Sequence, residues 1–123
     1  GPTQDGQPTL AEMSNAMVRL YKEKFGRGPT KTRSSYADEN TIIVTLENTL
    51  TSVERTMRDL GEKQRLEETR LFFQNATRDE FVATVERITG RKVRGFVSGM
   101  DADVDIATEV FYFEPRPTPS DPG

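Results

Sequence analysis

The sequence contains neither cysteine nor histidine. Their absence excludes disulfides, thiol nucleophiles, Ser-His triads and the zinc sites that these two residues build. A chain without cysteine is also typical of the cytosol, so we expect a cytoplasmic protein. The sequence has no phosphate-binding loop and no dinucleotide glycine pattern either. We therefore expect that the chain is not an enzyme and uses no cofactor.

Long hydrophobic runs are also missing. The longest uninterrupted aliphatic run covers residues 42–44, whereas a membrane-spanning helix needs ~20 mostly apolar residues. We therefore expect no direct membrane insertion. The net charge is −3, and basic residues alternate with acidic ones along the chain. Because nucleic-acid-binding proteins usually carry a basic patch, nucleic acid is not an expected partner.

The two ends of the chain differ in composition from the middle. Residues 1–8 and 115–123 together hold six of the seven prolines and no aromatic residue. Such segments bury too little apolar surface to offset the entropy lost on ordering. We therefore expect one folded domain, 9–114, between two disordered tails, of which the C-terminal one is proline-rich. The initial Gly-Pro is typical of a remnant left by tag cleavage.

Apolar spacing and end signals predict helices in three segments. Capping boxes begin the first two, 9–25 and 51–60, and a glycine follows each segment. The third segment, 63–89, is either one helix or two helices that meet near Asn75. The expected core positions are Leu10, Met13, Met17, Leu20, Tyr21 and Phe25 in the first, Val53, Met57 and Leu60 in the second, and Phe73, Ala76, Phe81, Val85 and Ile88 in the third.

Two hairpins complete the predicted elements. Strands 31–37 and 41–47 flank one turn, and strands 92–98 and 104–114 flank another, with β-branched and aromatic residues in each. The order is helix, hairpin, helix, helix, hairpin (α-β-β-α-α-β-β). This order predicts an α+β fold, in which a four-stranded, mainly antiparallel sheet has about three helices packed on one face.

The predicted strands carry apolar residues on both faces. Phe96, Phe111 and Phe113 alternate with valine, isoleucine and tyrosine positions. Helices on one side cannot cover both faces, and exposed apolar patches usually mark partner surfaces. We therefore expect a homodimer, with Phe96, Phe111 and Phe113 on the dimer or partner face.

The acidic run at 101–105 has the alternating aspartates of a calcium loop. A calcium loop needs glycine at its sixth position and glutamate at its twelfth. This chain has Ile106 and Tyr112 at those positions. We therefore interpret the run as a solvated hairpin and expect no metal site.

A short glycine-rich loop follows the first helix. Its basic residue, Arg27, either contacts an anionic ligand or partner, or complements the negative end of the helix dipole. On the first interpretation the loop is the candidate contact site for a ligand or partner. Its residues are Gly26, Arg27, Gly28 and Pro29.

Three stretches taken together resemble the MpsC-like family. They are residues 21–29 (YKEKFGRGP), 46–54 (LENTLTSVE) and 85–93 (VERITGRKV), in that order and spacing. The resemblance spans about 9–114. One departure is Ser52, where that family's helix start often carries proline; the difference affects a helix start and no chemistry.

The resemblance implies a link to a sodium-translocating, membrane-potential-generating system that is associated with inorganic-carbon uptake. It implies no catalytic residues and no ligand that could be carried over to this chain. We therefore expect a non-catalytic accessory or regulatory protein that self-associates and docks on a partner, such as a membrane transport protein. The alternative is a small-molecule or anion-binding sensor domain that uses the loop at 26–29 and the neighbouring sheet.

Overall fold

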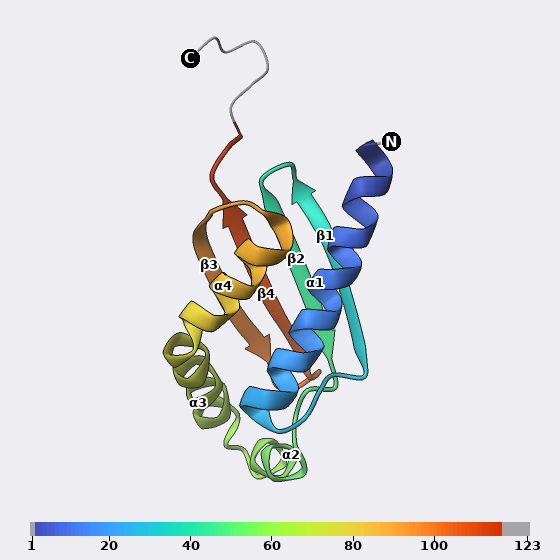
Figure 1. Cartoon of the computed structure of the whole chain (residues 1–123). Coiled ribbons are helices and arrows are strands. Elements are labelled where there is room, and N and C mark those ends of the chain that lie inside the picture. The colour runs from blue at the N-terminus through green and yellow to red at the C-terminus, as the bar shows by residue number, and fades with distance from the viewer. Residues whose placement is uncertain (1, 117–123) are drawn as a thin grey trace.

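A computed structural model describes residues 2–116, with side chains from residue 9 onward. Over this part of the chain the predicted α+β class is confirmed, with four helices and four strands (Figure 1). The segment 63–89 is two helices, not one. In chain order the elements are α1 (Pro2–Phe25), β1 (Lys31–Asp38), β2 (Thr41–Glu47), α2 (Ser52–Asp59), α3 (Lys63–Ala76), α4 (Arg78–Thr89), β3 (Val93–Asp101) and β4 (Ile106–Phe113).

Helix α1 lies across the sheet with its predicted apolar stripe facing inward. Met13, Met17, Leu20 and Tyr21 are buried, and Leu10 and Phe25 pack against them. The helix ends as predicted at Gly26, which has a φ of +81°. A glycine adopts this left-handed conformation without the strain that a Cβ atom causes.

The start of α1 differs from the prediction. The helix begins at Pro2, so the capping box at Thr9 does not mark its first turn. The sequence favours a start at Thr9 because Thr9 and Glu12 have the spacing of a capping box. The segment expected to be an N-terminal tail is thus helical from Pro2 onward. Most of the expected C-terminal tail, 117–123, lies outside the described residues.

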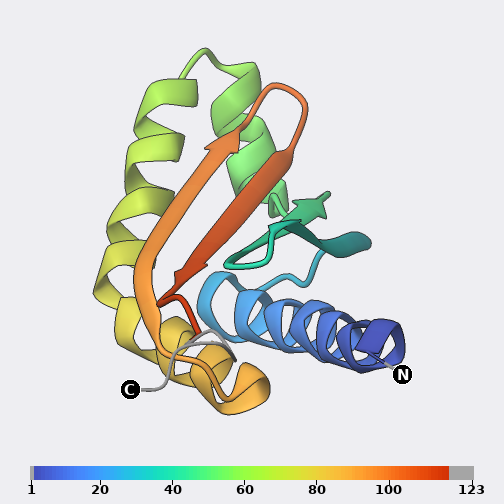
Figure 2. The same ribbon diagram turned by 90° about the horizontal axis from the view of Figure 1, so that it is seen from above.

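The sheet has the strand order β1-β2-β4-β3, and every neighbouring pair is antiparallel. Both predicted hairpins are therefore confirmed. They join along β2 and β4, where Ile42 lies opposite Phe111. Helices α1, α3 and α4 lie on one side of this sheet (Figure 2), and α2 lies beyond one end of it (Figure 1).

The main core lies between α1, α4 and the covered face of the sheet. Phe81 of α4 stacks on Phe96 of β3, and Phe96 stacks on Phe111 of β4, with ring centroids 5.9 and 4.7 Å apart. All three rings are buried. Aromatic contacts of this kind add to the large stabilisation that comes from burying the rings themselves.

The burial of Phe96, Phe111 and Phe113 overturns their assignment to a dimer or partner face. All three belong to the core of the chain itself. Alternation along a strand shows which residues share a face, but it does not show which face the helices cover. The open face instead carries the row Ile43, Val110 and Val97, which are in register across β2, β4 and β3.

The residues that α2 and α3 bury differ from those that the apolar spacing predicts. No residue of α2 is buried, and Val53 and Leu60 are exposed, because this helix lies past the end of the sheet. Met57 alone packs on a small second core. The buried residues of α3 are Leu66, Arg70 and Gln74. Phe73, an expected core residue, is exposed, whereas Phe81 and Val85 of α4 are buried as predicted.

Candidate functional site

A glutamate occupies the covered face of the central strand β4. Glu109 is fully buried between Ala107 and Phe111, and its cross-strand neighbours are Val44 and Ser98. Two side chains donate to its Oε2 atom: the Tyr21 hydroxyl from α1, and Gln74 Nε2 from α3 at 2.6 Å. Buried carboxylates need such donors because removal from water penalises a charge strongly.

Burial raises the pKa of Glu109 to about 7. The Ser98, Tyr21 and Gln74 side chains and the Arg70 charge act in the opposite direction, but their combined effect is smaller. Burial, followed by the nearby Glu109 carboxylate, also raises the pKa of Tyr21 well above its usual 10.0. The site therefore gains or loses a proton near neutral pH at Glu109 and not at Tyr21.

A pocket of about 210 Å³ lies next to this glutamate. Its lining residues come from the end of α1, from α3 and from the β3–β4 hairpin. Its walls combine apolar and polar side chains. They are formed by Tyr21, Phe25, Glu67, Arg70, Leu71, Gln74, Ser98, Gly99, Met100 and Ala107.

Arg70 forms one polar wall of the pocket and is held in place by three groups. Its guanidinium donates to both carboxylate oxygens of Glu54 at 2.7 Å and to the Thr49 carbonyl at 2.8 Å. It also lies over the Phe25 ring, 4.2 Å from the centroid. Such a bidentate pair fixes both partners, and the cation–π contact adds to it.

Glu54 joins this wall to the start of α2. It completes the predicted capping box, in which Glu54 N donates to Thr51 Oγ1 and Thr51 N donates to Glu54 Oε1. Burial acts to raise the pKa of Glu54, but the hydrogen bonds from Arg70 and Thr51 outweigh it and hold the pKa below 4.5. The carboxylate thus stays ionised opposite Arg70 at neutral pH.

The acidic hairpin turn lies outside the pocket lining and has a structural role. Asp105 is buried with a φ of +54°, and its carboxylate accepts from the backbone N–H groups of Thr49 and Leu50. The run is therefore not wholly the solvated hairpin that was predicted. Asp101 and Asp103 are exposed, and both contact Lys63 of α3.

The loop at 26–29 lies outside the pocket, although it directly follows Phe25 in its wall. Arg27 Nε donates to the Asn48 carbonyl at 3.0 Å, which ties the loop to the end of β2. A Cβ atom at Gly28 would lie 3.4 Å from Val18 of α1. Pro29 is partly buried. These contacts anchor the loop, and whether it also contacts a ligand or partner remains a prediction.

The sequence predicted Tyr21 and Phe25 as core positions of the first helix, but it did not predict the polar residues that surround the pocket. One signal for Glu109 was present, since this acid interrupts the otherwise apolar alternation Ala107, Phe111 and Phe113 in β4. Arg70 and Gln74 follow Leu66 at intervals of four, so they share one helix face. The apolar spacing alone predicts that the face of α3 with Phe72 and Phe73 is buried. In the structure the face with Arg70 and Gln74 is buried instead.

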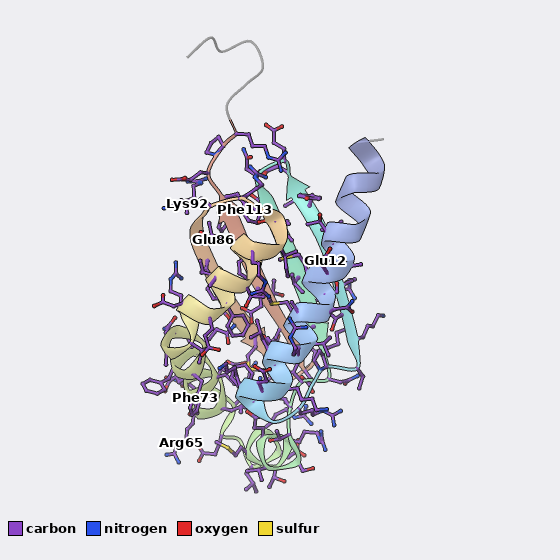
Figure 3. All side chains as sticks on the ribbon, viewed as in Figure 1. Glu12, Arg65, Phe73, Glu86, Lys92 and Phe113 are labelled. Atoms are coloured by element: carbon purple, nitrogen blue, oxygen red, sulfur yellow. The ribbon has the colours of Figure 1, made fainter. Side chains whose placement is uncertain are left out.

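Those phenylalanines form an exposed cluster on the outside of α3, here called the α3 apolar surface. Leu71, Phe72 and Phe73 are 45%, 67% and 47% exposed. The rings of Phe72 and Phe73 pack edge to face, with centroids 5.7 Å apart. Figure 3 shows Phe73 projecting away from the body of the molecule. Because Leu71 also lines the pocket, this surface reaches the pocket wall.

The fold and the pocket define a small α+β protein whose helices cover one face of an antiparallel sheet over a buried glutamate. Residues 7–115 match the family model described as Na+-translocating membrane potential-generating system (MpsC), and the chain belongs to this family. The predicted resemblance is thereby confirmed. Comparison with curated proteins and with solved structures gave no match. Across residues 2–116, none of the four helices combines the length and the apolarity required to cross a bilayer.

Proposed function

We propose that this chain is a non-catalytic accessory or regulatory protein of the membrane-potential-generating system, and that it docks on a membrane-embedded component through the α3 apolar surface. The observation that carries the proposal is the exposure of two adjacent phenylalanines on a helix that also buries three side chains inward. Aromatic side chains are enriched among the residues that dominate binding energy at interfaces. Membership of the MpsC family supports a membrane-embedded partner, because the family is described as a Na+-translocating membrane potential-generating system.

The polar groups beside the pocket support a binding role over a catalytic one. Arg70 is engaged by Glu54 and the Thr49 carbonyl, and Glu109 accepts from Tyr21 and Gln74. Catalysis requires a nucleophile, acid or base that can reach a reacting atom. Here the charged groups hold the fold together, so we assign the chain's action to its surface.

The docking test uses membrane vesicles from cells that contain the system and from cells that lack its membrane-embedded components. We expect the labelled chain to bind only the first kind of vesicle. The double variant Phe72→Ser, Phe73→Ser should lose this binding. A matched control, Val53→Ser with Leu60→Ser, replaces a side chain of α2 and one directly after its end, which are 71% and 76% exposed, and should bind as the wild type does. Equal binding by both variants contradicts docking through α3.

We also propose that the open face of the sheet pairs with a second copy of the chain. Its centre is the row Ile43, Val110 and Val97. The two edge strands of this face carry opposite charges, Lys31 on β1 and Asp101 on β3. These two residues are in register with each other across the four strands. A two-fold axis parallel to the strands places Lys31 of one copy over Asp101 of the other, so the face is complementary to itself.

Light scattering tests this pairing. We expect a dimer at micromolar concentrations, and we expect Val97→Asp to give a monomer because it places an unpaired charge at the buried centre of the interface. Val104→Asp is the control, since Val104 lies in the hairpin turn and is 60% exposed against 57% for Val97. A wild-type chain that is monomeric throughout this range rules out the pairing.

The alternative, a sensor domain for a small molecule, is favoured by a different observation. It is supported by the pocket between α1, α3 and the β3–β4 hairpin, whose lining does not include the loop at 26–29.

A further inference from the structure

One end of the Arg70 guanidinium carries hydrogen-bond donors that lack acceptors. A guanidinium has five N–H groups. Nε and Nη2 use three of them, on the two Glu54 carboxylate oxygens and on the Thr49 carbonyl. Among residues 9–116, no group accepts from the two N–H groups of Nη1. These two donors are therefore available to a group that this part of the chain does not supply.

The free donors can be reached by a ligand. Arg70 is only 6% exposed, but Nη1 is not one of the fully buried side-chain atoms that lack a partner, so it keeps accessible surface. Arg70 lines the pocket, and so does Phe25, whose ring the guanidinium covers. Because the Nε–Nη2 edge of this planar group faces Glu54, Nη1 lies on the opposite side. Its donors therefore belong to the pocket wall.

The neighbouring donors of the lining are already engaged. The Tyr21 hydroxyl and Gln74 Nε2 donate to Glu109, which lies behind the lining. The Ser98 side chain also hydrogen-bonds to Glu109. These groups thus hold a carboxylate of the fold, and Arg70 Nη1 is left to recognise a ligand. Recognition through a donor requires an acceptor on the ligand.

The size and the rest of the lining limit what this ligand can be. A cavity of ~150 Å³ lined by apolar side chains holds benzene, and the pocket here is about 210 Å³. Phe25, Leu71, Met100 and Ala107 supply apolar walls. A single ring with a short substituent fits this volume. Water alone would satisfy Nη1 but would gain nothing from the apolar walls, which favour an apolar group in its place.

The charges around the pocket favour a neutral ligand. The Arg70 charge is already balanced by Glu54, and Glu67 places a second carboxylate at the wall, where it repels an anion. Lys63 lies 4.0 Å from Glu67, but it is shared with two aspartates of the β3–β4 hairpin. A cation would be repelled by Arg70 and offers no acceptor. A neutral acceptor avoids the desolvation penalty of a second charge and still receives a hydrogen bond from a cationic donor.

We propose that this pocket binds a small uncharged molecule that has an apolar ring or chain and a carbonyl oxygen, and that the oxygen accepts from Arg70 Nη1. The proposal names the ligand class of the alternative sensor function, and it does not rest on docking. The pocket shares Leu71 with the α3 apolar surface, but ligand binding is measured on the chain alone, without vesicles. Failure of this proposal therefore leaves the docking proposal standing, and failure of docking leaves this one standing.

Acetophenone, α-methylstyrene and benzoate form a matched set of probes. The first two have nearly the same shape, but a carbonyl oxygen in acetophenone is a CH₂ group in α-methylstyrene, and benzoate adds a negative charge. We expect acetophenone to bind saturably in an NMR titration. α-Methylstyrene should bind about tenfold more weakly, the effect of one hydrogen bond from a charged donor, and benzoate should also bind more weakly than acetophenone. Absence of saturable acetophenone binding, equal affinity for acetophenone and α-methylstyrene, or tightest binding of benzoate overturns the proposal.

The same titration of the wild-type chain locates the binding. Acetophenone should shift the methyl signals of Leu71 and Met100, which line the pocket. It should leave the methyl signals of Ile43 unchanged, because Ile43 lies on the open face of the sheet. Shifts at Ile43 without shifts at Leu71 and Met100 would place the ligand elsewhere and overturn the proposal.

Variants of Arg70 test the donor itself. The double variant Arg70→Met, Glu54→Gln removes the free N–H groups and leaves no unpaired carboxylate behind. It should bind α-methylstyrene as the wild type does, but its preference for acetophenone should disappear. Arg70→Lys keeps a cation opposite Glu54 without the second terminal nitrogen, so it should weaken the preference even if the double variant does not fold. A full preference for acetophenone in either folded variant overturns the proposal.

Discussion

The covered face of the sheet has two halves that are held together by different forces. Under α4, Phe81, Phe96 and Phe111 form a continuous aromatic stack. Under α3, the same face carries Glu109 with Gln74 above it. Apolar burial is non-directional and insensitive to pH, whereas buried hydrogen bonds depend on geometry and protonation. We therefore expect the aromatic half to contribute most to stability and the polar half to make that stability depend on pH.

The aromatic half should give the largest loss of stability on truncation. We expect Phe111→Ala to lower the free energy of unfolding by ~3–5 kcal/mol, because it removes a buried ring and leaves a cavity. Urea denaturation measures this loss. Tyr112→Ala, the next residue on the partly exposed open face, should cost clearly less. Similar losses for the two variants would show that the helices do not define the core.

The polar half should make stability depend on pH. Folding raises the pKa of Glu109 from 4.5 to about 7, so the folded state holds the proton more tightly than the unfolded state. Stability therefore falls as the pH rises from 4.5 to about 7, by about 3 kcal/mol in total, and is level above that range. The groups that face Glu109 are Tyr21 from α1, Arg70 and Gln74 from α3, and Ser98 from β3.

The variant Glu109→Gln tests this pH dependence. It should flatten the stability profile between pH 4.5 and 7 and should be the more stable protein at pH 8. Urea titrations at several pH values measure both effects. Glu68→Gln, at an exposed position of α3, should keep the wild-type profile. A wild-type profile that rises over this range would contradict the burial of an acid with a raised pKa.

The ion pair at the pocket wall should have a smaller effect. We expect Arg70→Met to cost ~2–3 kcal/mol, since removal of one partner leaves Glu54 half-buried and without its cation. The double variant Arg70→Met, Glu54→Gln should recover part of this loss, and a thermodynamic cycle measures the coupling. Arg65→Met, on the exposed side of α3, is the control. Strict additivity would mean that the pair contributes nothing.

The smallest expected effect is at the start of α2. Thr51→Ala removes the oxygen that accepts from Glu54 N and should cost ~1 kcal/mol in urea denaturation. Thr56→Ala, an exposed position within the same helix, should cost less. If the two changes cost the same, the cap does not stabilise the helix.

Local features of the fold could be predicted from the sequence. The stop at Gly26 and the capping box at Thr51 depend on a few neighbouring residues, and the structure confirms both. The paired strands of each hairpin follow from alternation and turn residues. These predictions succeed because backbone conformation and short-range hydrogen bonds decide them.

The candidate site could not be predicted in this way. The faces of β4 both carry large apolar residues, so only the position of the helices shows that Phe111 is inside. Likewise, α3 has two stripes, one with Phe72 and one with Arg70, and apolar spacing favours the stripe that is in fact exposed. Arg70 is buried because Glu54, Thr49 and Phe25 meet it from distant parts of the chain. Such partners are visible only after tertiary packing.

The joining of the two hairpins through β2 and β4 has a consequence for how the chain folds. Each hairpin closes a short loop, but Ile42 and Phe111 pair only after the whole segment that holds α2, α3 and α4 has been looped out. The entropy of closing this long loop must be lost before the central pair of strands can form. We therefore expect docking of one hairpin on the other to be the slow step of folding. Until it occurs, β2 and β4 are each an open edge that can pair with another chain.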